Sequence, residues 1–273
     1  MPKPWRPRAS SLGYYWQCSQ RAQFDRGIAE GVFPSEIRDD SPSKPYASLG
    51  TVIHFYLQDG LRAEFPGPSK DYAPTEEEYN DAAKLFGSDR VSLMRAVESS
   101  ARAAALYMPT LPAGVRWLAE VAVDAGPHLA PGHIDFLSSD GAIIVDLKTT
   151  RTKPYGGRMK REALVQLTNY AMNAGASWGR AIYVDSMGGS WCTPIDIDWT
   201  KEETQVIQQE IPRLVKRLTD PSLYDTAYPG PLDDSCGDMF CPYTRVCRDA
   251  IVPRAAPEYT KKEALVPTGA MVL

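Results

Sequence analysis

The sequence lacks a long hydrophobic run. Interior apolar stretches last only a few residues, as at 142–145, whereas a membrane-spanning helix needs roughly 20. The basic residues of the segment 1–8 are followed by no apolar stretch, so the start of the chain does not resemble a secretory signal. We therefore expect an intracellular protein with no membrane partner.

An excess of charge and a paired set of cysteines are lacking as well. Thirty basic and 34 acidic side chains give a net charge of −4, so any binding of nucleic acid must depend on local patches. Five cysteines without a secretory signal argue against a secreted disulfide framework and leave metal binding or burial as their roles. A hydrophobic content of 43% excludes a chain that is disordered throughout.

Helical patterns dominate the first 110 residues. Apolar residues recur at helical spacing over 48–63 and over 91–108. Between them, Thr75 and Glu78 form a capping box that opens a helix ending near Gly87. This part of the chain contains no confident strand pattern.

From residue 116 the pattern changes to strands alternating with helices. Strand patterns cover 117–124, 132–137, 142–148 and 181–184, and helix patterns cover 160–174 and a segment that opens with a capping box of Thr200 and Glu203. The order strand, helix, strand predicts an α/β (α+β) fold with a mixed central sheet flanked by helices. We divide the chain into a helical region (1–112), a core (113–222), a cysteine-bearing segment (223–252) and a flexible tail (253–273).

The strands at 132–137 and 142–148 form a hairpin with an acidic face. If Asp140 and Gly141 are its two loop residues, Asp135 lies directly opposite Asp146. Carboxylates so placed, about 5 Å apart, either repel each other or share a divalent cation. Lys148 points to the same face as Asp146. Oxygen ligands suit Mg²⁺ or Mn²⁺, which catalyse phosphoester hydrolysis. The alternative is the ordinary polar end of a sheet, because Asp-x-Lys is a common tripeptide.

These segments resemble the PD-(D/E)XK nuclease superfamily in its RecB-like branch. The resemblance rests on Gly132-His-Ile-Asp135, on the residues 144–149, on Gln166-x-x-x-Tyr170 and on Gly50-x-x-x-His54. It implies a restriction-endonuclease-like core. It also implies a set of metal ligands, namely His54, Asp135, Asp146 and the carbonyl of Leu147.

The resemblance also assigns roles to neighbouring residues. Lys148 takes the water-activating role, and Gln166 and Tyr170 place DNA or support the lysine. Gln166 and Tyr170 share a helix face, which is equally typical of an ordinary solvated face. Glu120 resembles an additional acidic position of the family. His133, on the same strand face as Asp135, is a rival ligand to His54.

Four of the cysteines have the spacing of a metal site. Cys236, Cys241 and Cys247 lie near the end of the chain and Cys18 near its start. Spacing alone leaves zinc and a [4Fe-4S] cluster open, and four unliganded thiols are the remaining alternative. One cysteine before and three after the core resemble the iron-sulfur CRISPR-associated RecB-like exonucleases, although those usually have a C-x2-C step where this chain has C-x4-C. Cys192 is expected to be a small buried hydrophobe.

A basic segment follows the acidic hairpin. Residues 148–161 contain six basic and no acidic side chains, which favours contact with a phosphate backbone. Tyr155, followed by Gly156 and Gly157, is suited to stack on a base of single-stranded substrate. A solvated basic loop is the alternative interpretation.

The sequence therefore predicts a divalent-metal-dependent DNA exonuclease that acts on single-stranded ends. By family resemblance its context is phage or bacterial recombination, repair or CRISPR adaptation, with recombination or CRISPR-adaptation proteins or further copies of the chain as partners. Two other classes are a catalytically silent DNA-binding or assembly protein with the same fold and cluster, and a zinc-stabilised binding module unrelated to nucleases.

Overall fold

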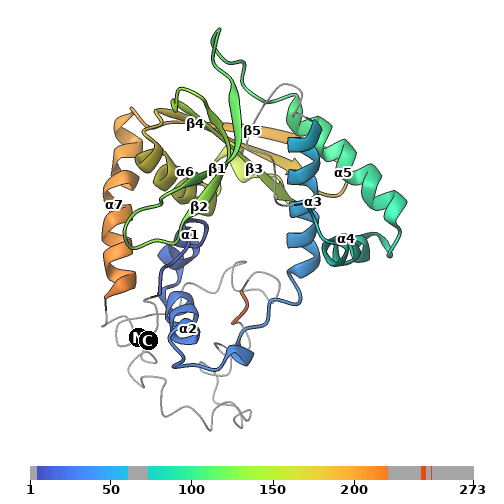
Figure 1. Ribbon diagram of the computed structural model, residues 1–273. Coiled ribbons are helices and arrows are strands. Elements are labelled where there is room, and N and C mark those ends of the chain that lie inside the picture. The colour runs from blue at the N-terminus through green and yellow to red at the C-terminus, as the bar shows by residue number, and fades with distance from the viewer. Residues whose placement is uncertain (1–4, 61–72, 221–240, 244–246, 248–273) are drawn as a thin grey trace.

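A mixed five-stranded sheet forms the centre of the part of the chain that the computed structural model describes, residues 5–60, 73–220, 241–243 and 247 (Figure 1). The strands lie in the order in which they follow one another along the chain. All neighbouring pairs are antiparallel except β3 and β4, which are parallel. The strands are β1 (Trp117–Val123), β2 (Gly132–Ser138), β3 (Ile143–Thr150), β4 (Trp178–Asp185) and β5 (Cys192–Asp198). The predicted mixed sheet is confirmed.

Helices cover both faces of this sheet, and each face has its own hydrophobic cluster. Helices α3 and α5 pack on one face and α1, α6 and α7 on the other (Figure 1). The helices are α1 (Ala9–Gln17), α2 (Ser19–Ala29), α3 (Lys44–Gly60), α4 (Glu76–Ala83), α5 (Arg90–Ala105), α6 (Arg161–Ala174) and α7 (Glu202–Thr219), with 3-10 turns η1 (Ser35–Ile37), η2 (Lys84–Phe86) and η3 (Tyr155–Gly157). Within the described ranges, no helix has the length and apolar content required to cross a membrane.

The central strands β3 and β4 are joined by α6, as the strand–helix–strand pattern predicts. A parallel pair cannot be connected by a tight turn, so the chain must cross over one face of the sheet, and here it does so as an amphipathic helix. Residues 144–147 and 181–185 are buried because helices cover both faces. The strand that carries Asp146 is thus held in the interior of the sheet.

The predicted helices are present with shifted ends. The capping box of α4 is confirmed: Glu78 N donates to Thr75 Oγ1 (3.2 Å) and Thr75 N donates to Glu78 Oε2 (2.8 Å). Helix α3 begins at Lys44, earlier than predicted, and the predicted end at residue 63 lies outside the described residues. Helix α5 ends at Ala105 because the next residues tighten into 3-10 turns, in which Met108 N donates to Ala105 O (3.2 Å).

The predicted capping box at Thr200 is wrong. Lys201 occupies the N-cap position of α7, and no side-chain hydrogen bond caps the helix. Thr200 instead donates from its hydroxyl (2.6 Å) and its backbone N (3.0 Å) to the Asp198 carboxylate. Asp198 ends β5 with a local turn and therefore removes Thr200 from the helix start.

The β2–β3 turn is longer than predicted, but its register is the predicted one. The loop comprises residues 139–142 rather than Asp140 and Gly141 alone. The Asp140 carboxylate accepts hydrogen bonds from Ser138 Oγ (2.5 Å) and Ala142 N (3.1 Å), and Gly141 takes the left-handed φ of 77°. Phe136 faces Val145, as a two-residue loop would also require. One added residue on each side of the turn leaves the register unchanged.

Candidate active site

The predicted site residues come from four elements, namely two neighbouring strands and one helix from each face of the sheet. Strand β3 supplies a buried carboxylate and an ammonium group, β2 a second carboxylate, α3 an imidazole and α6 an amide and a phenol. These residues are Asp146 and Lys148 on β3, Asp135 on β2, His54 on α3, and Gln166 and Tyr170 on α6.

Asp146 and Lys148 form a buried ion pair. The Asp146 side chain is 5% exposed, and Lys148 Nζ lies 2.9 Å from its Oδ2 and 3.1 Å from its Oδ1. Burial raises the pKa of Asp146 to about 6, and the charge of Asp135 adds to that shift while Lys148 opposes it. Burial would lower the pKa of Lys148, but the charges of Asp146 and Asp135 hold it above its usual value. Lys148 is therefore protonated at neutral pH and donates hydrogen bonds.

Asp135 lies at the point where the β2–β3 ladder opens. The ladder pairs Leu137 with Ile144 and Phe136 with Val145. Beyond these pairs, Leu147 N donates to Asp135 Oδ2 (2.8 Å). His54 Nδ1 lies 3.5 Å from the same carboxylate oxygen. The opening of the ladder thus brings together Asp135, the Leu147 backbone and His54, three of the residues that the family resemblance names as ligands.

His54 is suited to bind a cation. Burial lowers its pKa below the usual value. The negative charges of Asp146 and Glu120 oppose this shift only in part, and so does a hydrogen bond with the Leu147 backbone. A neutral imidazole at physiological pH has a lone pair available to a metal. The rival candidate His133 has an exposed side chain, whereas His54 reaches Asp135.

Glu120 has an uncommon backbone conformation. Its φ of 50° lies in the left-handed region inside β1, between the pairs Ala119–Phe136 and Val121–Ile134. Such a φ is rare for a residue with a side chain and concentrates at functional sites. Gln58, one turn after His54 on α3, donates from Nε2 to Glu120 Oε1. The backbone thus directs Glu120 towards the helix that carries His54.

Helix α6 supports the lysine through a chain of hydrogen bonds. Lys148 Nζ donates to Gln166 Oε1 (2.8 Å), and Gln166 Nε2 donates to the Tyr170 hydroxyl (3.5 Å). Tyr170 is 4% exposed, and burial raises its pKa. Its hydroxyl lies directly on Gly132, where an added Cβ would stand 2.4 Å from the oxygen. Gln166 therefore contacts the lysine directly, and Tyr170 is linked to it through Gln166.

Tyr14 on α1 is a neighbour of the site that the sequence did not predict. Burial, followed by the charge of Glu162, raises its pKa, and the charges of Arg21 and Lys148 oppose this. The Arg21 guanidinium lies over its ring at 4.4 Å from the centroid. Gly13 allows this approach, because an added Cβ would stand 2.5 Å from Glu162 Cα. Only the packing of α1 on α6 brings Tyr14 to the site, and no sequence signal marks it.

The donor atoms at this site fit a hard divalent cation. Among the described residues, no three His, Cys, Asp or Glu side chains are arranged as a ready-made metal site. The buried Asp146 Oδ2 nevertheless accepts no hydrogen bond, although the Lys148 ammonium lies 2.9 Å away. Carboxylate oxygens, a backbone carbonyl and an imidazole are donors that suit Mg²⁺ or Mn²⁺.

The cysteines of the predicted cluster are described only in part. Cys241 and Cys247 are half-buried against Phe24, Phe33 and Ile37, in the region that begins directly after Cys18. Cys236 and most of the predicted segment 223–252 lie outside the described residues, as does the predicted tail 253–273. The described cysteines form no metal-binding group.

Cys192 is half-buried rather than fully buried. Its side chain packs against the hydrophobic cluster beneath α3 and α5, and burial raises the pKa of its thiol to about 11.

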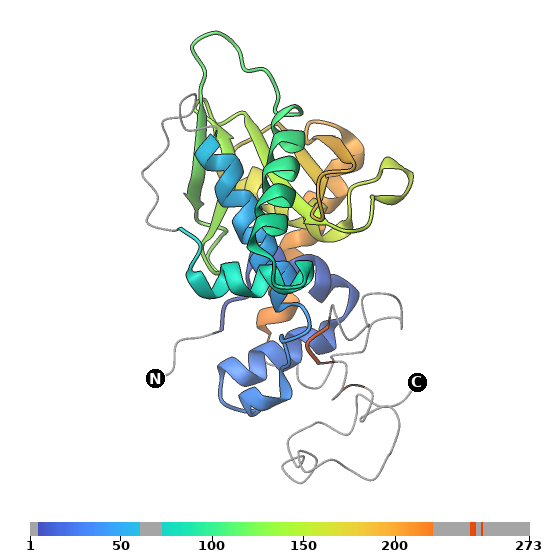
Figure 2. The same ribbon diagram turned by 90° about the vertical axis from the view of Figure 1, so that its right-hand side faces the viewer.

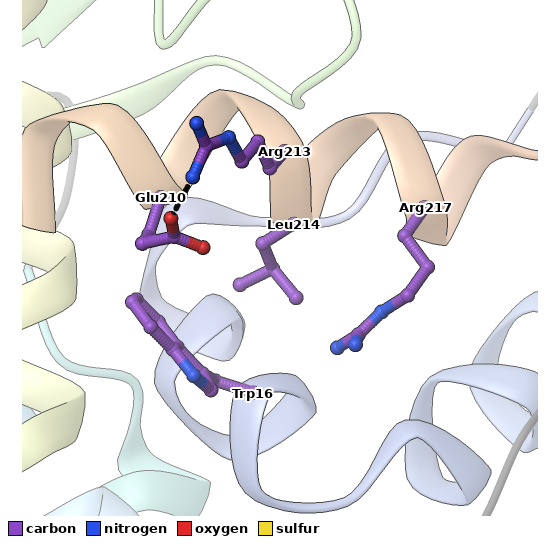
Figure 3. A pocket seen from close by; sticks show the side chains of 5 residues that line it. All are labelled: Trp16, Glu210, Arg213, Leu214 and Arg217. Atoms are coloured by element: carbon purple, nitrogen blue, oxygen red, sulfur yellow. Dashed lines mark hydrogen bonds and ion pairs between the residues drawn. The ribbon is translucent and has the colours of Figure 1, made fainter.

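A pocket lies between α1 and α7 (Figure 3). It contains none of the predicted site residues, and an ion pair between Glu210 and Arg213 crosses one side of it. Trp16, Leu214 and Arg217 complete its lining. We therefore place the chemistry at the acidic site on β2 and β3 and not in this pocket.

Comparison with known proteins gives one family. The family profile described as "PD-(D/E)XK nuclease superfamily" matches residues 9–248. No curated protein matches the chain.

Among solved structures, that of SSO0001 is 13% identical with a TM-score of 0.44, and the match covers 90% of this chain and 87% of that one. The alkaline exonuclease LHK-Exo from Laribacter hongkongensis is 17% identical with a TM-score of 0.29, covering 59% of this chain and 92% of that one. Its complex with dAMP is 19% identical with a TM-score of 0.31, covering 63% and 87%. These likenesses carry no argument about function.

Proposed function

The chain belongs to the PD-(D/E)XK nuclease superfamily, and from this premise we propose that it is a divalent-metal-dependent DNA exonuclease. Nucleases of this superfamily use divalent metals such as Mg²⁺ or Mn²⁺. The observation that carries the proposal is the buried Asp146–Lys148 ion pair beside Asp135, because it joins two metal-binding carboxylates to a hydrogen-bond donor at one point.

His54, Asp135, Asp146 and the Leu147 carbonyl would hold the metal. When bound, the ion supplies a Lewis acid that neutralises negative charge on the phosphodiester and on the leaving oxygen. Glu120 adds a further carboxylate on the side of α3, where Gln58 orients it.

Lys148 orients the attacking water in this proposal. The negative charges of Asp146 and Asp135 keep its ammonium protonated, so it donates a hydrogen bond rather than accepting a proton. Gln166 accepts one of its hydrogen bonds and thereby limits the positions that the ammonium can take. Tyr170 holds Gln166 from the other side.

The finer parts of the proposal concern substrate, cluster and partners. The basic segment 148–161 supports single-stranded DNA ends as substrate, in recombination, repair or CRISPR-adaptation-like processing. We further propose a [4Fe-4S] cluster on Cys18, Cys236, Cys241 and Cys247. We also propose that the chain acts with recombination or CRISPR-adaptation proteins or with further copies of itself. The proposed regions of the chain end at residues 112, 222 and 252.

DNA cleavage tests the central claim. End-labelled single-stranded and duplex DNA are incubated with Mg²⁺ or Mn²⁺ and the anaerobically purified protein. We expect metal-dependent release of nucleotides from ends, reduced at least about 100-fold in Asp146→Ala and Lys148→Ala. Lys216→Ala is the matched control, since Lys216 is exposed on α7. Uncut DNA with a folded protein, or equal cleavage by the variants, would favour the silent DNA-binding protein.

A further inference from the structure

The loop between β3 and α6 is held firmly at its base. Lys160 Nζ donates to Thr150 Oγ1 (3.1 Å), which joins the two sides of the loop. The Lys160 backbone N donates to the hydroxyl of Tyr183 (3.0 Å), a residue of β4 that is 1% exposed. Pro154, inside the loop, is buried as well. The loop is therefore attached to the interior of the sheet.

The tip of the same loop stands in solvent. Tyr155 is 96% exposed, the largest exposure of any large hydrophobic side chain among the described residues. Gly156 and Gly157 follow with φ of 60° and 66°, and their surroundings are open. Two left-handed residues reverse the chain here and leave the ring without a neighbour to pack on. Figure 2 shows this loop, in yellow-green, projecting at the right-hand edge of the molecule.

A single exposed aromatic side chain is common on protein surfaces. Tyr155 differs from that ordinary case because of the charges around it. Lys153 and Arg158 flank it and are exposed, and the whole segment 148–161 lacks an acidic residue. An aromatic ring between cations is the composition of surfaces that bind unpaired nucleic acid.

Arg151 joins the base of this loop to α3. Arg151 Nη1 donates to the Tyr46 hydroxyl (3.0 Å), and the guanidinium lies 5.8 Å from the centre of that ring. Arg151 is thus held between the loop and the first turn of α3, the helix that carries His54. The loop thus contacts the helix that carries His54 through Arg151.

The loop is also close to the catalytic strand along the chain. Tyr155 follows Lys148 by seven residues, which span at most about 25 Å when fully extended. A strand bound at Lys148 would thus reach the loop within a few nucleotides.

We propose that Tyr155 stacks on a base of an unpaired DNA segment whose phosphates lie on Lys153 and Arg158. Stacking requires a free base face, and in the interior of a duplex both faces are covered by neighbouring base pairs. The loop therefore selects single-stranded over paired DNA. This inference rests on the proposed function and adds the residue that recognises the substrate.

Binding measurements with three DNA probes test this inference. The probes are a fluorescein-labelled single strand, the same strand with abasic sites at its centre, and a blunt duplex, each with Ca²⁺ in place of Mg²⁺. The proteins are the wild type, Tyr155→Ala, Tyr155→Phe and Lys153→Gln. Fluorescence anisotropy gives the affinity of each protein for each DNA probe.

We expect Tyr155→Ala to weaken single-strand binding roughly 5- to 150-fold, the range of one base–aromatic stack. Tyr155→Phe should bind like the wild type, because the ring is retained. Lys153→Gln should weaken all three probes and reduce the salt dependence, since it removes one phosphate contact. For the abasic strand and the duplex, Tyr155→Ala and wild type should bind within about twofold of each other.

Equal binding of the single strand by Tyr155→Ala and wild type would overturn the stacking role. An equal loss of single-strand affinity in Tyr155→Phe and Tyr155→Ala would overturn it as well. Cleavage is measured on the same proteins with Mg²⁺. If the wild type cleaves DNA and Tyr155→Ala binds the single strand equally well, only the stacking inference is disproved. If Tyr155→Ala loses single-strand affinity but the wild type does not cleave DNA, only the proposed nuclease activity is disproved.

Discussion

Asp146 combines deep burial with a negative charge that the Lys148 ammonium balances by direct contact. Burial raises its pKa from 3.8 to about 6, so the folded protein binds this proton more tightly than the unfolded chain. The stability that this binding contributes is present below pH 3.8 and is lost as the pH rises through 6, an effect of about 3 kcal/mol. A cation bound at Asp146 would offset this loss at neutral pH.

We therefore predict that Mg²⁺ or Mn²⁺ raises the melting temperature at pH 7.5 and has a smaller effect at pH 5, where a proton competes for Asp146. Asp146→Asn should show little metal-dependent stabilisation at either pH. Differential scanning fluorimetry with and without EDTA measures both effects, and Asp196→Asn, on β5 away from the site, is the control. Equal stabilisation at both pH values would contradict the assignment of Asp146 as a ligand.

Some site residues were predictable one by one and others were not. Asp135, Asp146 and Lys148 follow from strand alternation, because a period of two fixes which side chains share a face. Glu120 needed the family resemblance, since alternation carries no sign of a residue at φ 50°. Tyr14 could not be predicted at all, because its place depends on the close approach of Gly13 to α6.

At the scale of elements, the β2–β3 hairpin was predicted better than its turn. Its register depends on which residues face the interior, and the buried Phe136 and Val145 satisfy that requirement. The turn depends on side-chain hydrogen bonds such as that of Ser138 to Asp140, which the Asp-Gly signal does not contain. The start of α7 was mispredicted for the same reason, since Asp198 competes for Thr200.

Helix α2 is tied to the C-terminal part of the chain by one carboxylate. Asp25 accepts hydrogen bonds from the hydroxyls of Tyr15 (2.7 Å) and Tyr243 and from Arg38 Nη1 (2.7 Å). The Tyr243 ring also lies 5.0 Å from that of Phe24, and it is fully buried. These contacts hold residues 241–243 against α2.

Tyr243→Phe should destabilise the protein by about 1.5 to 3 kcal/mol, because it removes a hydrogen bond to a charged group and keeps the ring. Asp39 N donates to Pro242 O (2.9 Å), so hydrogen exchange of the Asp39 amide should speed up in this variant. Tyr15→Phe loses a comparable bond within α1 and α2 and should leave Asp39 protected. Unchanged exchange in Tyr243→Phe would show that Asp25 does not hold this segment.

At the scale of the whole molecule, the proposed cluster connects the two ends of the chain. If it exists, anaerobically purified wild type absorbs broadly near 400 nm and contains about four irons. Serine in place of Cys18, Cys236, Cys241 or Cys247 should each lower the iron content, whereas Cys192→Ser on β5 should not. Iron and zinc analysis of these five variants tests whether the cluster is present and which cysteines bind it. One zinc per chain, or no metal, would contradict the iron-sulfur proposal.

The contact between Asp25 and Tyr243 joins residues 218 positions apart. It cannot form until the ribosome has added residue 243. The strands 117–198, in contrast, are complete before that point. A nascent chain therefore holds the strands of its acidic site before Asp25 acquires the hydrogen bond from Tyr243.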